Sequence, residues 1–137
     1  MANVVCTSFK PELLKGDHDF SSDSFKLALY TSSATSLADY TIYAVTNEAS
    51  GTNYSAGGTA LSGGTVSTSG TTGYADFTDC SFSSVTITAR YALIYNTTAS
   101  NKACFCLDFV GNKTATNGTF TITFPAAGAS AVLTITG

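Results

Sequence analysis

The chain contains no tryptophan, a single histidine and few charged residues, and each shortage narrows the functions to consider. Charged residues make up 11% of the sequence, against roughly 25% in ordinary soluble domains. The six Lys and Arg residues are scattered and the formal net charge is −3, so no basic stripe is available to neutralise a phosphate backbone. We therefore expect no nucleic-acid partner.

Long hydrophobic runs are also missing. No apolar stretch approaches the roughly 18 residues that a membrane span requires. The opening residues, Met-Ala-Asn-Val-Val-Cys, lack the basic region followed by an apolar run that marks a signal peptide. These features predict synthesis in a cytoplasm and no membrane partner.

Cysteine usage follows from the same reasoning. Without a secretory signal the compartment is reducing, so thiols are expected to stay free and to act as small buried hydrophobic side chains. Cys104 and Cys106 form one close pair, whereas a structural zinc site usually needs two. We therefore predict no metal site and free thiols at all four positions, which are Cys6, Cys80, Cys104 and Cys106.

Motifs that carry catalysis are scarce. His18 is the one histidine and lies between Asp17 and Asp19, where we expect a solvated turn or a capping role. The sequence has neither the Gly-x-Ser-x-Gly elbow of a serine nucleophile nor a Gly-Lys-Ser/Thr phosphate loop. Glycosidases bring distant carboxylates together, but this chain has no tryptophan to stack against a sugar. We predict that the chain is not an enzyme, with no catalytic residue and no cofactor.

Hydroxyl-bearing residues take the place of the missing charges. Threonine occurs 23 times and serine 17 times, so that 40 of 137 residues carry a small hydroxyl group. Threonine is β-branched and suits a half-exposed strand, and glycine recurs between the apolar runs as a turn residue. This composition indicates an all-β protein.

The pattern along the chain agrees with that composition. Residues 7–16 predict a two-turn helix that opens with a hydroxyl cap and ends at Gly16. Strands are predicted at 24–31, 59–67 with a bend at Gly63, 74–77, 84–95, 102–110, 118–124 and 131–136, with turns at 69–73, 96–101 and 111–118. The apolar run in 84–95 is typical of a central strand covered on both faces. Residues 32–56 have no clear period, and such excursions often contact a partner.

These elements predict one all-β domain over residues 1–137. It comprises an N-terminal arm and short helix at 1–16, and at 24–137 an antiparallel β-sandwich or barrel of about seven to eight strands. Seven strands separated by turns do not fit a parallel α/β fold.

Several segments together resemble a family of small structural proteins encoded by tailed bacteriophages. They are TSFK at 7–10, FKLALYTS at 25–32, TNE at 46–48 and LDF at 107–109. The resemblance implies a virion component made in the host bacterial cytoplasm. One placement is a capsid decoration or cement protein, which binds the major capsid protein and copies of itself as a homo-oligomer, often a trimer. The other is the neck, tail or fibre apparatus, including a host-recognition module.

The low charge favours the cement placement, because interfaces built from short hydrogen bonds and apolar contacts are screened less by salt than ion pairs. Two groups of residues are candidates for the interface. The first lies in the helix and consists of Phe9, Lys10, Leu13 and Leu14, although this helix would equally well plug one end of a sandwich. The second consists of Tyr40, Tyr43 and Tyr54, which fit stacking against a partner and equally fit the rim of the core. A host-recognition module would use the loops at 32–56 and 111–118.

Overall fold

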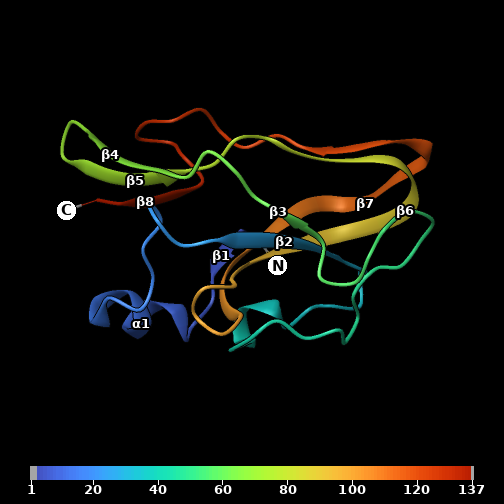
Figure 1. The fold of residues 1–137 in the computed structure, drawn as a ribbon, viewed down its shortest axis with the longest axis horizontal. Coiled ribbons are helices and arrows are strands. Elements are labelled where there is room, and N and C mark those ends of the chain that lie inside the picture. The colour runs from blue at the N-terminus through green and yellow to red at the C-terminus, as the bar shows by residue number, and fades with distance from the viewer. Residues whose placement is uncertain (1–2, 137) are drawn as a thin grey trace.

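The computed structural model describes residues 3–136, which form eight strands in two antiparallel sheets (Figure 1). The predicted all-β fold with one short N-terminal α-helix is confirmed, as two sheets rather than a closed barrel. Within these residues, no helix is long and apolar enough to cross a membrane. The elements are β1 (Val4–Val5), α1 (Phe9–Lys15), β2 (Phe25–Tyr30), the 3-10 helix η1 (Leu37–Asp39), β3 (Thr59–Ala60), β4 (Thr65–Ser69), β5 (Thr72–Asp76), β6 (Cys80–Asn96), β7 (Lys102–Ile122) and β8 (Leu133–Ile135).

The larger sheet has five strands in the order β1-β7-β6-β2-β3. β6 is its central strand, and every residue from Tyr91 to Asn96 is buried, as predicted for a strand covered on both faces. β2 pairs with this part of β6, with Leu27 opposite Ile94 and Leu29 opposite Ala92. The core is therefore centred on the β2–β6 pair.

β6 and β7 form one long hairpin that folds back on itself, as Figure 1 shows at the end of the molecule away from β4 and β5. Its ladder contains several register shifts, and positive φ angles occur at Ser84, Val110 and Asn117. Such bulges bend a strand without ending it. Across the bend, the rings of Phe109 and Phe120 lie 5.8 Å apart. The separate turn predicted at 111–118 is wrong, because those residues continue β7.

The smaller sheet has three strands in the order β4-β5-β8. The prediction of one bent strand over 59–67 is wrong, because β3 pairs with β2 while β4 pairs with β5 in the other sheet. Gly63 separates them at a φ of 68°. Its backbone passes so close to Thr78 that a Cβ would lie 2.1 Å from the threonine hydroxyl, which is why glycine is needed there.

Helix α1 ends as predicted, with Gly16 in the left-handed conformation at a φ of 81°. The hydroxyl cap predicted at its start is wrong. Ser8 makes no side-chain bond to the first turn, and its hydroxyl instead donates to the backbone carbonyl of Tyr40 at 3.4 Å. This contact fastens the helix to the segment that contains η1.

The segment at 31–58, which includes the residues 32–56 that have no clear sequence period, is tied to the large sheet at several points. The backbone N–H of Ala49 donates to Leu29 on β2, and the N–H of Ala103 on β7 donates to Thr41. Thr52 forms an isolated antiparallel bridge with Thr86 on β6. The segment therefore covers strand edges on both sides of the sheet instead of projecting into solvent.

Candidate functional site

The helix residues predicted as an interface fall on opposite faces of α1. Phe9 is 1% exposed and packs against the rings of His18 and Phe20, while Leu13 is partly buried against the core. Leu14 is 90% exposed, and Lys10 is exposed as well. One face of α1 thus plugs the core, and of the four predicted residues Leu14 and Lys10 remain on the surface.

The three predicted tyrosines lie partly buried against the core, and two of them converge on one carboxylate. The hydroxyls of Tyr43 and Tyr54 donate to the two oxygens of Glu48 at 2.5 Å and 2.7 Å. The backbone N–H of Gly57 donates to Glu48 Oε1 at 2.8 Å. Tyr40 lies apart from this cluster and donates to the carbonyl of Thr46 at 2.9 Å.

Burial sets the chemistry of this cluster. Burial is the main cause that raises the pKa of both Tyr43 and Tyr54, and their contact with Glu48 adds to the rise. The phenols therefore stay protonated as hydrogen-bond donors. The cluster, which we call the Glu48 clasp, holds segment 31–58 on β2.

His18 is buried, so the predicted solvated turn is wrong. Its Nε2 lies 3.0 Å from Glu12 Oε1, and its Nδ1 lies 3.0 Å from the amide nitrogen of Asn96. Because the Asn96 amide nitrogen is a donor, Nδ1 accepts and Nε2 carries the proton that is shared with Glu12. Asn96 also donates to Asp23 at 2.8 Å. Protein groups occupy both ring nitrogens, which fixes His18 as a link between α1 and the end of β6.

All four cysteines are free and buried, as predicted. Burial raises the pKa of Cys80 to about 11 and, with a contribution from Cys106, that of Cys6 to about 12. Residues 3–136 contain no group of three or more His, Cys, Asp or Glu side chains that could hold a metal ion. The thiols therefore serve as packing groups.

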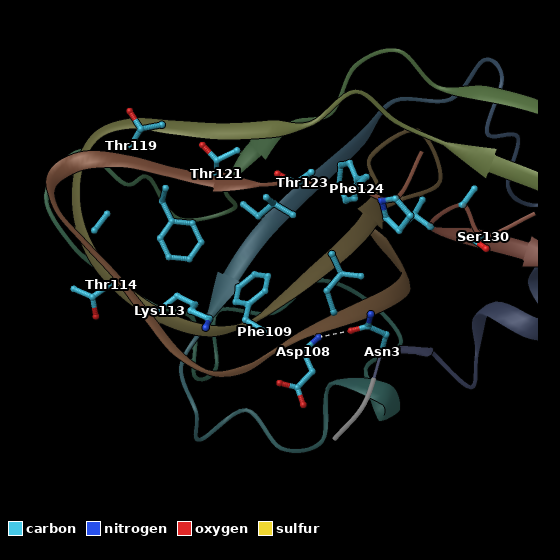
Figure 2. A pocket seen from close by; sticks show the side chains of 17 residues that line it. Asn3, Asp108, Phe109, Lys113, Thr114, Thr119, Thr121, Thr123, Phe124 and Ser130 are labelled. Atoms are coloured by element: carbon cyan, nitrogen blue, oxygen red, sulfur yellow. Dashed lines mark hydrogen bonds between the residues drawn. The ribbon is translucent and has the colours of Figure 1, made fainter. Parts of the chain in front are cut away.

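A groove on the surface was not predicted from the sequence. A groove of about 710 Å³ opens along β7 between the two arms of the folded hairpin, and Figure 2 shows the side chains that line it. Its apolar wall includes Leu107 and Phe109 from one arm and Phe120, Ile122 and Phe124 from the other. Alternation of apolar residues signalled each arm, but only the bend makes them face one another.

Polar groups border this groove. The N–H of Asp108 donates to Asn3 Oδ1 at 2.7 Å, and the Asp108 carboxylate accepts from Arg90 at 3.3 Å. Lys113 and Thr119 are exposed and line the groove. In Figure 2 the Asp108 carboxylate points away from the groove. The groove thus combines an apolar wall with a hydroxyl-rich border and one lysine.

β7 also presents a long strand edge beside the groove. β1 pairs with its outer side at Phe105 and Cys106, and within residues 3–136 no strand pairs with that side beyond Cys106. The N–H groups of Asp108 and Val110 on this side are bonded to Asn3 Oδ1 and to Asp108 Oδ1, so side chains rather than a strand occupy the part of the edge next to β1. A strand edge without a partner strand, next to an apolar groove, is the arrangement that accepts an added strand from another chain. We call this combination the β7 groove.

Comparisons with known proteins gave no match, whether with protein-family models, with curated protein sequences or with solved structures.

Proposed function

We propose that this chain is a structural component of a tailed-phage particle, and that it decorates and reinforces the outer shell of the capsid by binding the major capsid protein. The observation that carries the proposal is the β7 groove. Its apolar wall lies beside a strand edge that has no partner strand beyond Cys106, so a partner segment would gain side-chain burial and backbone hydrogen bonds there. The resemblance of several segments to small phage structural proteins is the reason for proposing a tailed-phage particle.

The rest of the surface supports assembly on a shell. Only 11% of the residues are charged, so contacts through hydroxyl and apolar groups resist changes in salt. Each contact is small, but many identical contacts on one shell add up through multivalency. The Glu48 clasp holds the segment 31–58, which forms isolated bridges to β2, β6 and β7 and covers part of these strand edges.

The test counts copies of the chain in purified particles of the phage that encodes it, by quantitative mass spectrometry. A decoration protein is expected at on the order of hundreds of copies per particle, because it repeats over the shell. About a dozen copies would instead support a neck, tail or fibre position. Absence from the particle would overturn the proposal.

A matched pair of variants tests whether the number of copies per particle depends on the groove. Thr119→Arg places a long cation at the groove border, where it obstructs an inserted segment. Thr116→Arg makes the same change at an exposed position of β7 that does not line the groove. We expect Thr119→Arg to lower the copy number at least tenfold and Thr116→Arg to leave it unchanged. An equal effect of both variants would show that the groove does not bind the capsid.

A further inference from the structure

The outer edge of β4 is a second uncovered strand edge, at the far side of the smaller sheet. β4 is the first strand of the order β4-β5-β8, and within residues 3–136 no strand lies beyond it. All five of its residues are exposed. Natural edge strands are usually protected by charged side chains or proline, yet residues 61–75 contain neither. This edge is therefore open to pairing.

The turn that joins β4 to β5 fixes which backbone groups point outward. Ser69 and Thr72 flank a two-residue turn that has Gly70 at a φ of 60°, so they form the hydrogen-bonded pair that closes the hairpin. Hydrogen-bonded pairs alternate along an antiparallel ladder. Consequently the N–H and C=O groups of Val66 and Thr68 face away from β5 and are available to another strand.

One face of the smaller sheet is apolar and extends beyond the core. Val66, Ala75 and Leu133 are cross-strand neighbours and so share this face, on which Ala75 is buried and Leu133 is partly buried against the core. Ile135 lies on the same face. Val66 is 56% exposed and Ile135 is 61% exposed, so this face is only partly covered within one chain.

We propose that two copies of this chain pair through β4, antiparallel about a two-fold axis at Ser67. In this register Val66 lies opposite Thr68 of the second copy, and each such pair exchanges two backbone hydrogen bonds. The two three-stranded sheets become one six-stranded sheet, and each apolar face continues into the other.

A second copy fits this edge better than an unrelated strand for two reasons. The outward groups at Val66 and Thr68 are spaced symmetrically about Ser67, so the edge is complementary to itself under a two-fold rotation. Pairing of identical strands places identical charges near each other, which is unfavourable, but residues 61–75 contain no charged residue. The pairing does not rest on the virion proposal, because it concerns the isolated chain.

Proline at position 68 tests the pairing without disturbing the hairpin. Thr68→Pro removes an N–H that points to solvent, and edge strands accept proline at such positions. Thr68→Val is the matched control, since it alters the side chain and keeps the N–H. Both purified variants and the unmodified chain are measured by light scattering up to about 1 mM, where even a weak association of small area is populated. Circular dichroism and thermal unfolding establish that each variant is folded.

We expect the unmodified chain and Thr68→Val to reach twice the monomer mass, and folded Thr68→Pro to stay monomeric. A monomer for the unmodified chain at the highest concentration, a trimer, or a dimer that persists in folded Thr68→Pro would each overturn the pairing. Should Thr68→Pro fail to fold, Val66→Lys replaces it, because two lysines beside the axis repel and should raise the dissociation constant at least tenfold. A dimer that is absent from phage particles would retain the pairing and overturn only the proposed function.

Discussion

The hydroxyl of Tyr54 donates a hydrogen bond to Glu48 at 2.7 Å, and the oxygen of the same hydroxyl accepts a hydrogen bond from the backbone N–H of Leu29 at 2.8 Å. One phenol thus connects the irregular segment 31–58 to the central part of β2. Tyr43 and Gly57 complete the set of donors around Glu48. Three donors thus meet one carboxylate, in addition to the backbone bonds that tie the segment to the sheet.

Replacing Glu48 should loosen this segment. Glu48→Ala leaves two phenols and one N–H without their acceptor, and we expect it to lower the free energy of unfolding by about 2–3 kcal/mol in urea denaturation. Glu48→Gln keeps an acceptor in place and should cost less. Hydrogen exchange is expected to speed up in residues 41–58 of the alanine variant. Unchanged stability of Glu48→Ala would show that the clasp is dispensable.

Asn96 should be among the most sensitive polar positions. It is fully buried, and its amide nitrogen contacts His18 and Asp23 while its oxygen accepts from the N–H groups of Thr98 and Ala99. Asn96→Ala removes all of these bonds and should lower the free energy of unfolding by about 2–4 kcal/mol. As control, Asn112→Ala on exposed β7 should stay within about 0.5 kcal/mol of the unmodified chain. Similar losses for both would contradict this ranking.

Asp19 should make stability sensitive to acid. Hydrogen bonds from Ser21, and then from Ser22, lower its pKa from 3.8 to about 2. A carboxyl with a lowered folded-state pKa stabilises fully above its unfolded value, and this contribution is lost as the pH falls towards 2. Asp19→Asn should therefore flatten the dependence of unfolding free energy on pH between about pH 4 and pH 2. Identical curves for the variant and the unmodified chain would argue against this assignment.

The cysteines should be inert in the folded chain. The reactive form of cysteine is the thiolate, and burial raises the pKa of Cys80 to about 11 and that of Cys6 to about 12. Titration with an aromatic disulfide reagent at about pH 8 should label all four thiols only after denaturation. Rapid labelling of the native protein would show that a thiol is accessible.

The sequence predicted best where a local pattern determines the structure. The position of β2 was predicted correctly, although every residue from Leu27 to Tyr30 is buried, and Gly16 ends α1 because it adopts a left-handed backbone without strain. The error at 111–118 has a physical reason: Gly111 and Asn117 suit turns, and the same preference for positive φ suits the bulges of a continuous strand. A local pattern cannot distinguish a turn from a bulge, because the difference lies in whether β6 continues to pair.

At the candidate surfaces too, the sequence indicated local patterns and the tertiary structure decided how they combine. Alternating residues indicated the apolar faces of β7, but the groove exists only because the hairpin folds and brings Phe109 to Phe120. His18 was expected in a solvated turn or a capping role, but it is buried and bonded to Asn96, which lies 78 residues away in the sequence.

The sequence by itself determined the all-β class and the short α-helix that ends at Gly16, since composition acts on average and a helix-ending glycine acts locally. The tertiary structure alone decided which polar groups were buried and which strand edges stayed open. Those outcomes depend on pairing between distant strands, and one residue of register or one bulge moves a side chain from the core to solvent.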